Sequence, residues 1–208
     1  MSHIINISLS QGYFPHELKY GCITPIFKNG EKESVSNYRP VCAVSPFSKI
    51  IEKIVHNRMI EYLDTHQILG KSQFGFRKNM GTETALIDYI DRVHKGLKNK
   101  HYIISIFLDL SKAFDVMDHD ILKLKLDHYG FRGEFLDFLM NFVQNRQYFV
   151  NANGTKSHMK TVNIGVPQGS TLGPLLFLLY INDMINNSNI FHFTQLLMIQ
   201  QPHIAVRI

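Results

Sequence analysis

An aspartate directly follows an apolar run in the stretch Ile104–Asp115, which reads ISIFLDLSKAFD. The residues from Tyr102 to Leu108 are almost all apolar, so they predict a buried strand that ends at Asp109. A buried carboxylate is costly unless it is paired or bound to a metal ion, which makes Asp109 a candidate metal ligand. The alternative is a strand-end aspartate that is exposed at a loop and caps the next turn.

A second segment, Gly165–Pro174, reads GVPQGSTLGP and combines three glycines with two prolines. Glycine lets a backbone approach a ligand closely, and the amide of Gln168 can both donate and accept hydrogen bonds. The N-terminal end of the apolar helix that is expected next would favour phosphate or another polar group. The segment lacks the Gly-Lys-Ser or Gly-Lys-Thr of a Walker loop, and an ordinary helix-start loop is the alternative.

Helical and strand-like patterns alternate around these two segments, which predicts an α+β fold. Strands are expected at residues 22–27 and 102–108 and on both sides of Asn153-Gly154, a strong hairpin signal. Helices are expected over Phe47–Leu63, from near Thr82, over residues 121–129, around residues 135–143 and over Leu172–Ile185. The polar stretch between residues 28 and 40 predicts a loop between two short strands.

For two of these helices the sequence also predicts where the helix begins or ends and, for the first of them, which residues form its apolar stripe. Ser45 and Pro46 provide an N-cap and a first helical position, and the apolar stripe that follows is Ile50, Ile51, Ile54, Val55 and Met59. Residues 121–129 can be capped by Asp118 or Asp120 and ended by Gly130, but their LKLKL run also alternates as a strand does.

The bulk composition sets limits on the class of protein. The 208 residues suit one domain, or one domain with an added lobe. No apolar run reaches the length of a membrane span, and the first residues do not have the pattern of a signal peptide. Cys22 and Cys42 are expected to be reduced thiols, and the eleven histidines never show zinc-site spacing.

The positive charge is concentrated in the first half of the chain. Residues 1–100 hold 14 Lys and Arg against 9 Asp and Glu, whereas residues 101–208 hold 8 of each. A basic face attracts phosphates, although a solvated surface gives the same balance.

Four segments in order resemble the reverse transcriptase domain of non-LTR retrotransposons, of the jockey-like and related kinds. FLDLSKAFDVMDH and GVPQGSTLGPLLFLLYINDM resemble palm blocks, while CITPIFKNGEKESVSNYRPVCAVSPFSKIIEKIVHNRM and SQFGFRKNMGTETAL resemble fingers blocks. The resemblance covers roughly residues 6–193. It implies a partial right-hand polymerase, with a basic fingers-like region at 1–100, a partial palm at 101–193 and no thumb; residues 194–208 form a tail that does not match.

The resemblance implies RNA-directed DNA polymerase chemistry, in which Mg²⁺ or Mn²⁺ ions promote transfer of a dNTP to a primer 3′-hydroxyl. Asp109 and the carbonyl of Leu110 would hold metal, and Phe114 would exclude a 2′-hydroxyl from the sugar site. The implied nucleotide contacts are Pro167, Gln168 and Gly169.

The resemblance also implies contacts for three basic residues. Lys28 and Arg39 would contact the triphosphate, and Arg77 would contact the template or a phosphate. For each of them the alternative is a solvated surface charge. The implied partners are an RNA template, a DNA primer and dNTPs, and the parent element would work in a nuclear or cytoplasmic setting.

The sequence departs from the family where a third palm block with two aspartates is expected. No acidic residue follows Asp183, so the second-metal ligands are absent from this sequence. Asp115, Asp118 and Asp120 are interpreted as helix-cap and surface acids. We therefore expect the chain to be inactive alone, with a frameshifted or spliced-in tail from about Thr194. The alternative is a non-catalytic, nucleic-acid-binding remnant of a retrotransposon protein.

Overall fold

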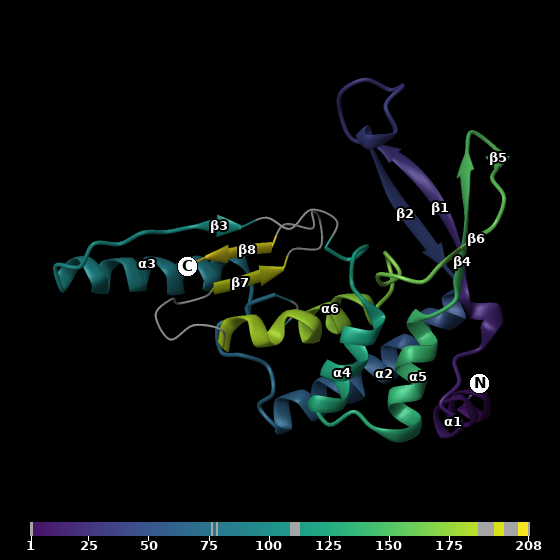
Figure 1. Cartoon of the computed structure of the whole chain (residues 1–208), viewed down its shortest axis with the longest axis horizontal. Coiled ribbons are helices and arrows are strands. Elements are labelled where there is room, and N and C mark those ends of the chain that lie inside the picture. Colours follow the sequence, from purple (N-terminus) through teal and green to yellow (C-terminus); the bar gives the residue numbers. More distant parts are fainter. Residues whose placement is uncertain are drawn as a thin grey trace. The chain divides into compact units, whose positions relative to one another are not determined.

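The computed structural model describes residues 2–75, 77, 79–108, 113–186, 194–197 and 204–207 (Figure 1). Contacts divide the chain into two compact units. The first comprises Met1–Glu61 and Phe114–Phe177, and the second comprises Tyr62–Ala113 and Leu178–Ile208. The predicted α+β class is confirmed, whereas the division into fingers, palm and tail stays a prediction.

The first unit is built on a mixed sheet. Its strands are β1 (Tyr20–Phe27), β2 (Tyr38–Val44), β4 (Arg146–Ala152), β5 (Thr155–Lys156) and β6 (Lys160–Val162). β1 pairs antiparallel with β2 and parallel with β4, and β4 pairs antiparallel with both β5 and β6 (Figure 1). The β4–β5 connection has positive φ at Asn153 and Gly154, +51° and +81°, which confirms the predicted hairpin.

Helices complete the first unit. They are α1 (Ser2–Ser10), the short η1 (His16–Lys19) and η2 (Val35–Asn37), α4 (His119–His128) and α5 (Gly133–Val143). α5 packs against α1 and α4. Phe14, which is fully buried, makes edge-to-face contacts with Phe138 and Phe142 at centroid distances of 5.8 and 5.1 Å.

Residues 121–129 had a pattern that fitted either a helix or a strand, and the structure shows that they belong to a helix, α4. The Asp118 carboxylate accepts hydrogen bonds from the backbone N–H groups of Asp120 and Ile121, so Asp118 is the cap. Leu122 and Leu126 are fully buried, whereas Leu124 is exposed. A strand would place all three on one face, so this burial pattern has the helical period.

The second unit contains α3 (Thr82–Lys98) and a three-stranded antiparallel sheet. The strands are β3 (Phe107–Leu108), β7 (Thr194–Leu197) and β8 (Ile204–Arg207), in the order β3-β8-β7. Two helices cross the boundary along the chain, α2 (Pro46–Thr65) and α6 (Gly173–Ile181), and the short η3 (Asn182–Asn186) follows α6. In the part of the chain described, no helix is both long and apolar enough to cross a membrane.

The strand expected at residues 102–108 is wrong in its extent and in its burial. Only Phe107 and Leu108 are paired, with Arg207 and Val206 of β8. Tyr102 and Ile104 are 102% and 80% exposed. A strand forms only where a partner strand supplies hydrogen bonds, and none of the described residues pairs with residues 101–106.

Both predicted helix starts near Pro46 and Thr82 are confirmed, but their apolar stripes need correction. In α2, Ile50 and Ile54 are exposed, and the buried face is Ser48, Ile51, Glu52, Val55 and Met59. In α3, Leu86, Ile90 and Leu97 of the expected stripe are exposed. The apolar periodicity predicted both helices correctly. The face of each helix that is buried depends on the elements that pack against it.

Candidate functional site

The glycine-rich loop, residues 163–172, is joined to residues 114–119 by backbone hydrogen bonds in the first unit. The N–H of Val166 donates to the carbonyl of Phe114 and the N–H of Gly165 donates to the carbonyl of Met117, both at 2.8 Å. The buried His119 lies with Nε2 2.7 Å from the Gly165 carbonyl. A carbonyl can only accept, so Nε2 carries the proton here.

Gly165 is required where the loop meets this segment. Its φ is +78°, and a Cβ placed on it would lie 2.6 Å from the Phe114 carbonyl oxygen and 2.9 Å from Asp115 backbone atoms. Gly169 has a φ of +85°, and its Cβ would lie 2.8 Å from the Cys42 carbonyl oxygen on β2. The loop therefore approaches two different backbones more closely than any side chain permits.

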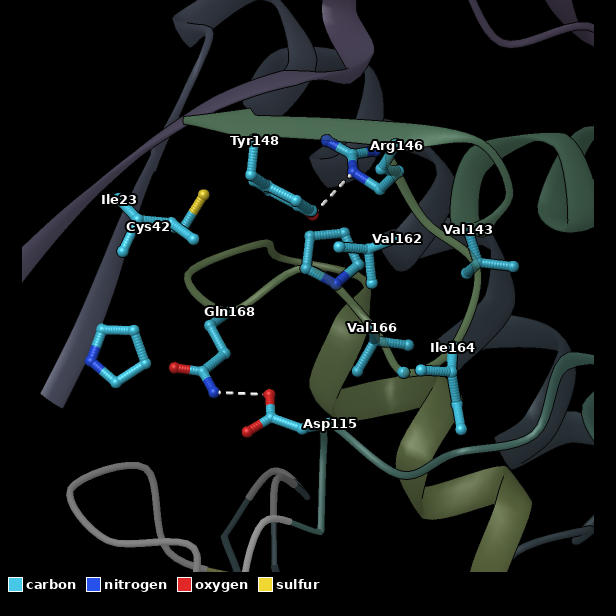
Figure 2. Close-up of a pocket in the computed structure, with 13 residues that line it drawn as sticks. Ile23, Cys42, Asp115, Val143, Arg146, Tyr148, Val162, Ile164, Val166 and Gln168 are labelled. Carbon is cyan, nitrogen blue, oxygen red and sulfur yellow. Dashed lines mark hydrogen bonds between the residues drawn. The ribbon is translucent and has the colours of Figure 1, made fainter. Parts of the chain in front are cut away.

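Two polar side chains meet at the loop. Gln168 donates from Nε2 to Oδ1 of Asp115 at 2.7 Å, although the two residues are 53 positions apart (Figure 2). Gln168 is half-buried and Asp115 is exposed. A hydrogen bond to an ionised carboxylate is stronger than one between neutral groups.

A buried carboxylate from α2 holds the other end of the loop. Glu52 is 0% exposed. Its Oε1 accepts from the Ser48 hydroxyl at 2.6 Å, and its Oε2 accepts from the N–H groups of Thr171 and Leu172 at 2.6 and 3.3 Å. These N–H groups precede α6, so Glu52 satisfies donors at the start of that helix.

A cavity of about 220 Å³ lies between the loop and the sheet (Figure 2). Pro167, Gln168 and Asp115 line it together with Arg146 and Tyr148. The other lining residues are mostly apolar: Ile23, Pro40, Cys42, Val143, Val162, Ile164, Gly165 and Val166. The cavity can therefore hold an apolar body, with hydrogen-bonding groups at a few points.

Arg146 is a buried cation beside the cavity. Its side chain is 1% exposed. Nη1 donates to the Phe142 carbonyl at 3.0 Å, and Nε donates to the Tyr148 hydroxyl at 3.1 Å. The guanidinium also lies over the Phe142 ring at 5.1 Å.

Burial shifts the pKa of three groups near Arg146. Burial lowers the pKa of the Lys19 ammonium, and the Arg146 charge lowers it further. Burial raises the pKa of the Tyr148 hydroxyl and of the Cys42 thiol, and Arg146 opposes both increases. This part of the core therefore favours neutral forms of its side chains around one fixed positive charge.

Several of the predicted site residues belong to the first unit. Phe114 is half-buried and packs on Phe177 at a centroid distance of 5.0 Å. Lys28 and Arg39 are exposed near the β1–β2 turn, where Arg39 pairs with Ile26. Side chains alternate along a strand, so Arg39 lies on the face opposite that of Pro40, a cavity residue.

The remaining predicted residues are elsewhere. Arg77, in the second unit, donates from Nη1 to the carbonyls of Gly70 and Gln73 at 3.0 and 3.4 Å, so it braces its own loop. Asp109 and Leu110 lie outside the described residues. Among the residues that are described, no group of three His, Cys, Asp or Glu side chains could hold a metal ion.

Comparison with known proteins decides the family. A family model described as "Reverse transcriptase (RNA-dependent DNA polymerase)" matches residues 27–199. The chain belongs to the reverse transcriptase family. The predicted resemblance to the reverse transcriptase domain of non-LTR retrotransposons is thereby confirmed.

Two relatives of this reverse transcriptase domain come from Drosophila melanogaster. The RNA-directed DNA polymerase from mobile element jockey is 35% identical over 182 residues, which cover 87% of this chain and 20% of that protein. The probable RNA-directed DNA polymerase from transposon X-element is 32% identical over the same length and shares of the two chains. The chain thus spans about a fifth of the length of these curated relatives.

A solved structure shares the fold of this reverse transcriptase domain. It is apo telomerase from Candida tropicalis truncated from its C-terminal domain, with a TM-score of 0.61 and 15% sequence identity. The match covers 99% of this chain and 48% of that chain. At this identity the likeness concerns the fold alone.

Three residues of the site were not predicted from the sequence: Glu52, His119 and Arg146. For Glu52 a signal was present, because a glutamate at a position beside Ile51 and Val55 places a charge near the core face of a helix. Arg146 and His119 had no such local signal.

Proposed function

We propose that this chain is the nucleotide- and template-contacting part of an RNA-directed DNA polymerase. In this proposal Pro167, Gln168 and Gly169 lie against the incoming dNTP, and the Phe114 ring excludes a 2′-hydroxyl. One observation carries the proposal most directly: the glycine-rich loop is hydrogen-bonded to the backbone of Phe114 itself. The residues proposed to contact the base pair and the sugar therefore lie on two segments that are joined by backbone hydrogen bonds.

The charge requirements of the reaction suggest roles for other residues. Phosphoryl transfer depends mainly on positioning and on neutralising charge, so Lys28 and Arg39 are proposed to contact the triphosphate. Asp109 and the carbonyl of Leu110 are proposed to hold Mg²⁺ or Mn²⁺, which would supply neutralising charge for the phosphates. An RNA template, a DNA primer and dNTPs are the proposed partners, and Arg77 is proposed to contact the template or a phosphate.

We expect the chain alone to extend no primer. The sequence has no acidic residue after Asp183, and Asp109 cannot by itself hold two divalent ions. The measurement is extension of a labelled DNA primer on an RNA template with Mg²⁺ and, separately, with Mn²⁺. Incorporation of dNTPs that is abolished by Asp109→Ala would contradict this expectation.

A second candidate function is nucleic-acid binding without catalysis, through the basic first half of the chain. The observation that favours it is that Lys28 and Arg39 are exposed, and none of the described residues forms an ion pair with either. Such cations are free to contact phosphates.

For this second candidate we expect binding of a primer–template duplex to weaken steeply with salt. Lys28→Ala and Arg39→Ala should each reduce the slope of log K against log salt by about 1, because each removes a phosphate contact. Filter binding across a salt series measures this slope. Lys95→Ala is the control, since Lys95 is an exposed lysine already paired with Asp91. Binding that does not depend on salt would exclude phosphate contacts by either residue.

A further inference from the structure

We propose that Asp115 is a positioning residue that holds the amide of Gln168 in one orientation for the nucleotide. The inference rests on the proposed function of the glycine-rich loop and adds a residue to that site. It also revises the role expected for Asp115, which the sequence suggested to be a cap or surface acid.

The chemistry of the contact fixes the direction of the amide. Oδ1 of Asp115 lies 2.7 Å from Nε2 of Gln168. An ionised carboxylate only accepts hydrogen bonds, so the NH₂ group must face Asp115. Rotating the amide by half a turn would bring its carbonyl oxygen against the carboxylate, and two acceptors repel each other. Asp115 therefore selects one of two orientations that a free glutamine would sample.

The backbone holds both residues in place for this contact. Phe114, which precedes Asp115, accepts from Val166, and Met117, which follows it closely, accepts from Gly165. The two segments are thus joined on either side of Asp115, and Gln168 follows on the same loop. Because two backbone hydrogen bonds already hold the loop beside residues 114–117, the Asp115 side chain does not need to pull the loop into place, and its effect is on the orientation of the amide.

Few other polar side chains line the cavity beside the amide. Gln168 and Asp115 lie together beside a cavity whose other lining residues are mostly apolar (Figure 2). With Nε2 committed to Asp115, Gln168 presents its Oε1, an acceptor, and one remaining N–H to a ligand. A nucleotide carries hydroxyl and exocyclic amine donors that an acceptor at this position can recognise.

A double-mutant cycle on the full chain tests the inference. The measurement is binding of a radiolabelled dNTP in the presence of Mg²⁺, by equilibrium dialysis. Gln168→Ala and Asp115→Ala are each expected to weaken binding by roughly tenfold, the effect of one lost hydrogen bond. The double variant should bind no worse than Gln168→Ala, because Asp115 acts only through Gln168.

Two further variants separate positioning from a general structural role. Asp115→Asn keeps the shape, but its amide can donate as well as accept. It therefore no longer selects one orientation of Gln168 and should recover only part of the affinity that Asp115→Ala loses. Asp120→Ala removes a nearby exposed acid in the first turn of α4 and should leave binding unchanged. The inference would be overturned if the losses of dNTP affinity in the two single variants added in the double variant. It would also be overturned if Asp115→Ala lost no affinity.

A second measurement does not depend on nucleotide binding. In protein labelled with ¹⁵N-glutamine, the side-chain NH₂ resonances of Gln168 are identified by their loss in Gln168→Ala. They should shift in Asp115→Ala and stay close to wild type in Asp120→Ala. If the wild-type chain binds no dNTP but these resonances shift, the proposed function fails and the contact stands. If they do not shift, the positioning role is wrong whatever the nucleotide result.

Discussion

Replacing Gly165 with alanine is expected to lower the free energy of unfolding by about 3 kcal/mol or more. The added Cβ would lie 2.6 Å from the Phe114 carbonyl oxygen and 2.9 Å from two backbone atoms of Asp115. Backbone atoms cannot rotate away as the end of a side chain can, so the loop must separate from residues 114–117. That separation breaks the hydrogen bonds from Gly165 to Met117 and from Val166 to Phe114. Urea unfolding followed by circular dichroism measures the loss.

Gly154→Ala is the matched control for this substitution. Gly154 has a φ of +81°, close to the +78° of Gly165, but a Cβ there would meet no atom within 4 Å. It therefore imposes the same backbone strain without the clash, and a loss of about 1 kcal/mol is expected. Equal losses for the two variants would show that the close approach to Phe114 and Asp115 is not important for stability.

Replacing Glu52 with alanine is the second substitution with a large expected effect. It should lower the free energy of unfolding by about 3 kcal/mol. The carboxylate is fully buried, and it accepts hydrogen bonds from Ser48, Thr171 and Leu172. Alanine would leave these donors without their acceptor and would create a cavity beside the start of α6. The same unfolding measurement applies.

Two comparisons identify the cause of the Glu52 effect. Glu52→Gln keeps the shape and one acceptor oxygen, so it should lower the free energy of unfolding clearly less than Glu52→Ala does. Glu83→Ala removes an exposed glutamate from the first turn of α3 and should cost only a few tenths of a kcal/mol. If Glu52→Ala costs no more than Glu83→Ala, the buried carboxylate does not hold the loop.

Local chemistry allowed several parts of the fold to be predicted. Ser45-Pro46 gave the start of α2, and Asn153-Gly154 gave the β4–β5 turn, because in each case the signal lies within a few residues. Residues 102–106 were predicted as strand and are not, since a strand depends on a partner from a distant part of the chain. The apolar pattern alone contains no information about that partner.

In the candidate site, too, local signals could be predicted and contacts between distant residues could not. The glycines and prolines around Gln168 could be recognised from composition, and the family resemblance gave them a predicted role. The supporting contacts could not be recognised, because Asp115 and Gln168 are 53 positions apart and Glu52 and Thr171 are 119 positions apart. Asp109 was the first residue to suggest chemistry, and its role stays a prediction because it lies outside the described residues.

The parallel pairing of β1 with β4 has a consequence for the order of folding during synthesis. Tyr20 is opposite Gln147, so β1 cannot pair with β4 until a ribosome has made the roughly 100 residues that separate β2 from β4. At 5–20 residues per second, the β1 edge that will receive β4 stays unpaired for on the order of ten seconds. An open edge can pair with other chains, so the nascent first unit is at risk of aggregation during this interval, and chaperones would have to protect it.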